Sequence, residues 1–330
     1  MYYALSTALL FIVGWLAITT PLWLIVYRFS YMRIVSRRLL DEASLPDANR
    51  VEPEHGHEEC EFTTRDGLTL RGSYLRTSAP ARLGVVLFCH ELTGDRWNGL
   101  PYLSDLREQG WDVFTFDFRS HGRSEVQPGY DPKPWLTEFD RLDAHAALDY
   151  LVSRPDVEPR RIVVYGVSRG GGAALILAAD RPREIGAVVT DGAYPVSGAL
   201  ARLVRRFMAG YTKLAWYLKL FPDWAFDIHI LWAMSVRSRQ TGVRYVRPES
   251  FAPRVRQPVL MIHGARDIYV TAELAKRLAG AVAGPTTFWS VPTAKHNGAI
   301  HTAPEEYHER LSSFVRPLAA PVKAARPTTV

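Results

Sequence analysis

The sequence predicts an α/β protein in which helices cover both faces of a mostly parallel sheet. Short apolar, β-branched segments alternate with helical segments from residue 83 to residue 315, and an antiparallel hairpin pattern precedes them. An uncharged apolar segment at the start of the chain predicts an N-terminal transmembrane helix. The 330 residues are therefore expected to form an anchor (1–27), a juxtamembrane linker (28–57), the α/β domain (58–316) and a flexible tail (317–330).

The expected anchor contains no charged residue from Tyr2 to Tyr27. A helix of this length spans about 37 Å, enough for a hydrocarbon core of about 30 Å. A cleaved signal peptide is the alternative, but it would have a basic N-terminal region and a shorter apolar core. Basic residues follow the segment and none precedes it: Arg28, Arg33, Arg37 and Arg38. This asymmetry predicts a single-pass membrane protein whose large domain is cytoplasmic.

Composition limits the class of partner. The net charge is +6 and the isoelectric point is near 9.3, with the basic residues spread along the chain. No basic run with interleaved aromatic residues is present, which argues against nucleic acid and favours an anionic membrane surface. Cys60 and Cys89 are the two cysteines, too few for a disulfide framework.

The expected elements follow from periodicity. Residues 59–65 and 68–76 alternate apolar and polar side chains around Asp66-Gly67, which predicts a hairpin. Apolar runs predict the remaining strands at 83–89, 111–118, 162–165, 185–190, 259–262 and 286–291. Helical spacing predicts helices at 100–109, 135–153, 171–179, 271–282 and 303–315.

The segment Arg161–Ala174 is the centre of this organisation. An apolar strand is followed at once by Gly166-Val167-Ser168-Arg169-Gly170 and then by a small-residue helix. A strand that turns sharply into a helix strains the residue at the turn, and glycines two before and two after it let the chain pass. This G-x-S-x-G pattern in its strand–turn–helix context predicts that Ser168 is a nucleophile.

Two further chemical groups follow later strands. Asp267 comes shortly after strand 259–262, and His296 shortly after strand 286–291. Ligands of such sheets bind beyond the carboxyl ends of the strands, so the three side chains are expected to meet there. His296 would remove the hydroxyl proton of Ser168, and Asp267 would hold the other imidazole nitrogen. The alternatives are His301 or His121 for the base and Asp191 for the acid.

An acyl-transfer serine also requires an oxyanion hole made of two backbone N–H groups. The residue after the nucleophile, Arg169, is expected to supply one. The loop after strand 83–89 is expected to supply the other, from Leu92 or, as the alternative, Glu91.

These residues carry a resemblance to a known family. From about Glu59 to Val315 the chain resembles the α/β-hydrolase superfamily, on the stretches Cys89–Gly94, Asp117–Ser124 and Gly166–Gly170 together with Asp267 and His296. The resemblance implies that Asp117–Ser124, which contains His121, is scaffold.

One position departs from the family pattern. Glu91 stands where glycine is usual in the oxyanion loop. A negative side chain there would oppose the oxyanion unless it points away or pairs with Arg96 or Arg119.

The regular alternation is interrupted at about 193–256, where the resemblance implies a cap over the site. Residues 199–236 are rich in aromatic and basic side chains. Two interpretations remain open: a lid that touches apolar substrate or the bilayer, and a helical cap that buries its own core.

The predicted function is that of a membrane-anchored serine hydrolase, which cleaves a small-molecule or lipid-like carboxylic ester through an acyl-enzyme. No metal or cofactor motif is seen, and the chemistry requires none. The same triad could instead serve a serine peptidase or an acyl-protein thioesterase. A catalytically inactive membrane scaffold is the third alternative, which Glu91 keeps open and the intact Ser168, Asp267 and His296 argue against.

Overall fold

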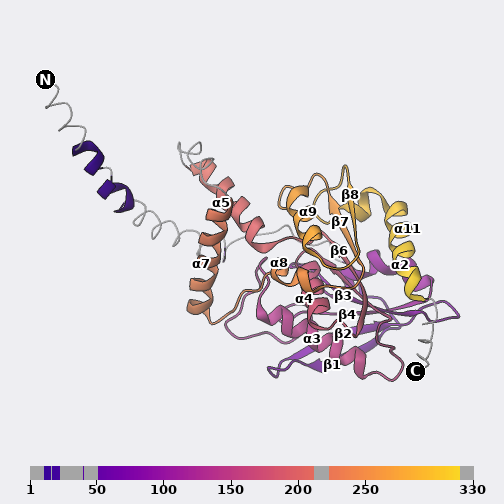
Figure 1. Cartoon of the computed structure of the whole chain (residues 1–330). Coiled ribbons are helices and arrows are strands. Elements are labelled where there is room, and N and C mark those ends of the chain that lie inside the picture. The colour runs from indigo at the N-terminus through magenta and orange to yellow at the C-terminus, as the bar shows by residue number, and fades with distance from the viewer. Residues whose placement is uncertain (1–10, 16, 23–39, 41–50, 212–222, 320–330) are drawn as a thin grey trace, which may run out of the picture.

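An eight-stranded sheet forms the centre of the computed structural model, which describes residues 11–15, 17–22, 40, 51–211 and 223–319 (Figure 1). The strand order is β1-β2-β4-β3-β5-β6-β7-β8. The strands are β1 (Glu58–Thr63), β2 (Thr69–Leu75), β3 (Gly84–Cys89), β4 (Trp111–Phe116), β5 (Ile162–Val167), β6 (Ile185–Asp191), β7 (Val259–Gly264) and β8 (Thr286–Val291).

The direction of the strands confirms the predicted class. β1 and β2 form the expected antiparallel hairpin, and β2 is antiparallel to β4. Every other neighbouring pair is parallel. The carboxyl ends of β3, β5, β6, β7 and β8 therefore lie at one edge of the sheet, where a site is expected.

Helices cover both faces of the sheet, as predicted. One face packs against α3 (Glu138–Ser153), α4 (Arg169–Asp180) and part of α9 (Ala272–Ala281). The other packs against α2 (Leu100–Glu108), α10 (Ala299–Thr302) and α11 (Pro304–Val315).

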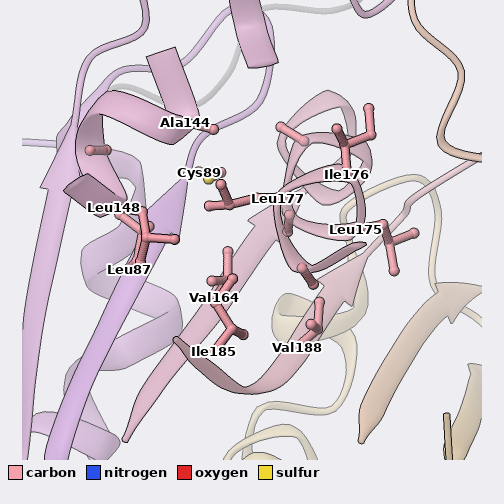
Figure 2. Packing of buried hydrophobic residues seen from close by; sticks show 14 of the residues in the cluster. Leu87, Cys89, Ala144, Leu148, Val164, Leu175, Ile176, Leu177, Ile185 and Val188 are labelled. Carbon is pink, nitrogen blue, oxygen red and sulfur yellow. The ribbon is translucent and has the colours of Figure 1, made fainter. Parts of the chain in front are cut away.

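Successive side chains of β3 alternate between these two cores, as a strand buried on both faces requires. Figure 2 shows the first core, where Leu87 and Val164 of the sheet lie beside Leu177 of α4 and Leu148 of α3.

The helix predicted from residue 135 begins at Glu138, three residues later. Thr137 is its N-cap, and the Asp140 carboxylate accepts a hydrogen bond from the Thr137 N–H at 2.7 Å. This reciprocal cap fixes the start of α3. Short helices complete the described chain: η1 (Arg96–Gly99), α8 (Pro248–Phe251), η2 (Ala252–Arg254) and η3 (Arg316–Ala319).

The insertion at 193–256 contains two long helices, α5 (Val196–Tyr211) and α7 (Asp223–Thr241), which pack on each other beside the sheet (Figure 1). Leu200, Val204, Ile230 and Met234 are buried between them, in a cluster that reaches Val270 near the carboxyl edge of the sheet. Leu40, from the expected linker, is buried in the same cluster. The insertion therefore packs into a core that it shares with neighbouring parts of the domain.

The expected anchor is described only at 11–15 and 17–22, which are helical. Within the described ranges, no helix has the length and apolar character needed to cross a bilayer. The rest of 1–27, the linker residues 28–39 and 41–50, and the tail residues 320–330 lie outside the described residues.

Candidate active site

Ser168 lies at the turn between β5 and α4. Its backbone has φ 51° and ψ −114°, a conformation that a residue with a side chain rarely adopts. Hydrogen bonds hold the turn on both sides: the Ser168 N–H donates to the Asp191 carbonyl at 2.7 Å, and the Gly171 N–H donates to the Ser168 carbonyl at 3.0 Å. The strained serine is thus fixed by its surroundings.

The two glycines of the motif are required by close backbone contacts. A Cβ added to Gly166 would lie 2.1 Å from the Gly170 carbonyl oxygen. A Cβ added to Gly170 would lie 2.1 Å from the Cys89 carbonyl oxygen, at the end of β3. The sharp turn of the elbow therefore depends on both glycines.

The structure brings together the three side chains that the sequence selected. Ser168 Oγ lies 2.8 Å from His296 Nε2, and His296 Nδ1 lies 2.5 Å from Asp267 Oδ2. The Asp267 side chain is fully buried, and that of His296 is 10% exposed. With Nδ1 protonated and donating to the carboxylate, Nε2 is left as an acceptor for the serine proton.

The hydrogen bonds around Asp267 stabilise its ionised form. Its Oδ1 accepts hydrogen bonds from the Tyr269 and Val270 N–H groups at 2.8 and 2.9 Å, while Oδ2 faces His296. Burial alone would raise the pKa of Asp267, but the hydrogen bonds from His296 and the two backbone N–H groups outweigh it and lower the pKa.

The alternative acid and bases lie elsewhere. His301 is exposed on α10. Both ring nitrogens of His121 face carbonyl oxygens, those of Arg119 and Leu92. Asp191 is buried at the end of β6, where its Oδ2 accepts a hydrogen bond from the Tyr307 hydroxyl at 3.0 Å.

The loop from His90 to Gly94, called here the 90–94 loop, follows β3 beside the elbow. His90 Nε2 accepts a hydrogen bond from the Phe118 N–H, so the ring proton lies on Nδ1 and is donated to the Glu91 carbonyl at 2.6 Å. Burial lowers the pKa of His90 well below its usual value, which keeps the ring neutral. The Glu91 carbonyl oxygen accepts the hydrogen bond from His90. Because the peptide bond between Glu91 and Leu92 is trans, the Leu92 N–H points in the opposite direction to that carbonyl.

A family model described as the alpha/beta hydrolase fold matches residues 84–227. The uncharacterized protein MT2364 of Mycobacterium tuberculosis is 30% identical over 253 residues, which cover 77% of this chain and 76% of that protein. The chain belongs to the α/β-hydrolase superfamily.

Two further similarities extend over most of this α/β-hydrolase. The alpha/beta hydrolase domain-containing protein WAV2 of Arabidopsis thaliana is 24% identical over 267 residues, 78% of each chain. The solved esterase Pf2001 of Pyrococcus furiosus has a TM-score of 0.59 at 21% identity, covering 84% of this chain and all of that one. At that identity the structural likeness shows the fold.

The Arg169 side chain of this hydrolase is buried, which the sequence did not indicate. Its Nη2 lies 2.9 Å from Asp140 Oδ1, and its Nη1 donates to the Lys133 carbonyl at 3.2 Å. The side chain thus ties the elbow to the start of α3. Arg169 is the first residue of α4.

Of the two arrangements considered for Glu91, pairing with an arginine and pointing away, neither Arg96 nor Arg119 provides the pairing. Arg96 pairs with Glu59 at 2.9 Å, and Arg119 pairs with Asp66 and Asp143, each at 2.7 Å. The Glu91 carboxyl instead folds back over Gly94, where an added Cβ would lie 3.0 Å from Glu91 Cδ.

Beneath the triad lies a buried polar cluster that the sequence did not reveal. The Tyr307 hydroxyl bonds to both the Asp191 carboxyl and the Tyr165 hydroxyl. Burial raises the pKa of Asp191 to about 7. Tyr165 lies inside a strand and Tyr307 inside a helix, positions where each resembles an ordinary core residue. In the described residues no group of three His, Cys, Asp or Glu is placed to hold a metal ion.

Proposed function

We propose that this α/β-hydrolase is a serine hydrolase that cleaves a carboxylic ester through an acyl-enzyme on Ser168. The observation that carries the proposal is the continuous contact from Ser168 Oγ to His296 and on to Asp267, at 2.8 and 2.5 Å. A serine hydroxyl becomes nucleophilic when a neutral imidazole takes its proton during attack, and a buried carboxylate stabilises the resulting cation.

The reaction proceeds in two halves. Ser168 Oγ attacks the ester carbonyl while His296 Nε2 takes the proton, and the oxyanion is held by the backbone N–H groups of Arg169 and Leu92. His296 then gives the proton to the departing alcohol. Water attacks the acyl-enzyme with His296 again as base, which releases the acid and restores Ser168. Leu92 is preferred to Glu91 because His90 fixes the 91–92 peptide through its carbonyl.

An apolar ester fits the rim of the site. Ile268 and Tyr269 directly follow Asp267 and are 57% and 38% exposed, and the Tyr269 ring stands edge-on to His296 with 5.7 Å between centroids. The similarity to a protein named an esterase supports ester cleavage. A peptidase and a thioesterase on the same triad are distinguished by a panel of matched ester, thioester and amide substrates.

We also place the chain at a membrane, through residues 1–27, with the hydrolase domain cytoplasmic. Support comes from the absence of charge between residues 2 and 27 and from Phe11, Trp15, Ile18 and Leu22, which are all more than half exposed. Alkaline carbonate extraction of cell membranes tests the anchor, and protease protection of sealed vesicles tests the orientation. Release of the intact chain by carbonate would contradict the anchor.

Labelling of the full chain by a fluorophosphonate probe tests the catalytic proposal. We expect wild type to label and Ser168→Ala not to label, with unchanged thermal unfolding as the check that the variant folds. Short and long p-nitrophenyl esters measured alongside define the acyl preference. A folded wild type that fails to label would overturn the proposal in favour of an inactive scaffold.

A further inference from the structure

Glu91 lies in the 90–94 loop, which is proposed to supply the second N–H group of the oxyanion hole, and its carboxyl folds back over Gly94. The residue directly precedes Leu92, and the 90–94 loop borders the elbow at Gly170, whose added Cβ would lie 2.7 Å from the His90 carbonyl oxygen. Glu91 Oε2 is buried and has no hydrogen-bond partner in the part of the chain that the structure describes. A buried carboxylate without a partner is costly, whereas a neutral carboxyl is tolerated far better.

The surroundings supply little positive charge to offset an anion at Glu91. Arg96 and Arg119 are fully engaged by other carboxylates. The titratable groups that face Glu91 come from several parts of the fold: Asp191 at the end of β6, Asp95 before η1, His296 after β8, Tyr102 of α2 and Tyr165 of β5.

The balance of these groups favours the protonated acid. Burial, with smaller contributions from Asp191 and Asp95, raises the pKa of Glu91 to about 7, against the opposing effects of its own backbone N–H and of His296. A proton on this carboxyl is therefore gained or lost near neutral pH.

We propose that Glu91 is a positioning residue, whose carboxyl must carry a proton for the 90–94 loop to hold the oxyanion-binding conformation. The proposal rests on the proposed function, since it concerns the same oxyanion hole. When Glu91 loses its proton, Oε2 becomes a buried anionic oxygen without a hydrogen-bond partner among the described residues, so the carboxylate moves toward water and displaces the adjoining Leu92 N–H. An anion that stayed in place would oppose the negative charge that develops on the substrate oxygen.

This arrangement predicts a bell-shaped dependence of activity on pH. The acid limb reflects the need for a neutral catalytic base, and the alkaline limb reports ionisation of Glu91. Glu91→Gln keeps the shape of the neutral acid but cannot ionise, so the alkaline limb should disappear. If Glu91 had only a structural role, Glu91→Gln would change the rate by the same factor at every pH.

The test is the second-order rate of fluorophosphonate labelling of the full chain from about pH 5.5 to about pH 9.5. Above its pKa the neutral fraction of an acid falls about tenfold per pH unit, so wild type should slow by roughly 10- to 100-fold between about pH 7 and pH 9. Glu91→Gln should stay within about twofold of its maximum there. Glu309→Gln removes an exposed carboxyl on α11 and should follow wild type.

A second variant identifies the group responsible without depending on Glu91→Gln. Asp191 raises the Glu91 pKa, so Asp191→Asn should move the alkaline limb to lower pH. Two results would overturn this inference but not the proposed function. One is the loss of the alkaline limb in Asp191→Asn, and the other is identical pH profiles for wild type and Glu91→Gln. Absence of labelling in every folded protein at every pH would overturn the proposed function, and this inference with it.

Discussion

Arg169 Nη2 donates to Asp140 Oδ1 across 2.9 Å, and the two side chains are 1% and 3% exposed. The same carboxylate caps α3, because Asp140 Oδ2 accepts hydrogen bonds from the Thr137 N–H and hydroxyl at 2.7 and 2.9 Å. One buried carboxyl group therefore joins the residue after Ser168 to the first turn of the neighbouring helix.

Asp140→Asn should destabilise the fold by about 3 kcal/mol, because it leaves the Arg169 guanidinium buried without its counter-charge. Urea unfolding measures the loss. Glu138→Gln is the matched control: its pair with Arg141 lies on the same turn with about a third of each side chain exposed, so the change should stay within about 0.5 kcal/mol.

A double variant checks the cause of that loss. Arg169→Met in the Asp140→Asn background removes the unpaired charge and should recover part of the stability. Equal stability of Asp140→Asn and Glu138→Gln would show that the buried pair is not the origin of the effect.

Asp267→Asn should lower kcat/KM for a p-nitrophenyl ester by roughly 10,000-fold with little change in unfolding, because the amide no longer holds His296 in the tautomer that accepts the serine proton. Asp191→Asn is the control. Asp191 is buried like Asp267, but its carboxyl bonds to Tyr307 and not to His296. We expect it to retain activity within about tenfold at its optimum pH. A larger loss in Asp191→Asn would make Asp191 the functional acid.

Much of this arrangement could be predicted from the sequence because its signals are local. Apolar runs mark the strands, Gly166 and Gly170 mark the elbow, and the order of strand exits brings Asp267 and His296 toward Ser168. Each of these features depends on a few consecutive residues and on one topological rule.

The features that escaped prediction depend on contacts between distant segments. The pairing of Arg169 with Asp140 and the burial of Leu40 against the insertion require the tertiary fold. The tertiary fold also determines that Arg96 pairs with Glu59 and Arg119 with Asp143. As a result, neither arginine is available to pair with Glu91. Propensity and spacing carry no information about which charges meet in a core.

Asp191 should make the stability of the fold depend on pH. Burial raises its pKa from 3.8 to about 7, so between these values the folded protein keeps a proton that the unfolded chain releases. Stability from this group is fully present below about pH 3.8 and falls as the pH rises to about 7, by on the order of 4 kcal/mol.

Asp191→Asn isolates this contribution. The variant should gain stability relative to wild type as the pH is raised from about 4.5 to about 7.5, by about 3 kcal/mol in urea unfolding. The altered hydrogen bond to Tyr307 changes the free energy of unfolding by the same amount at every pH. This change therefore cancels when the difference between variant and wild type is compared across pH. A gap between the two proteins that does not change with pH would mean that Asp191 is ionised in the fold.

Gly192 carries the last prediction, because it leaves room for the His296 ring. Its φ is +70°, and an added Cβ would lie 2.5 Å from Asn297 Oδ1 and 3.2 Å from His296 Cε1. Gly192→Ala should therefore destabilise the fold by about 1–3 kcal/mol and, by displacing the imidazole, lower kcat/KM about 100-fold. Gly280→Ala is the control: Gly280 lies in α9 with open space around it, and alanine should stabilise the helix by about 0.5–1 kcal/mol without changing turnover. Full activity in Gly192→Ala would show that the imidazole does not need this space.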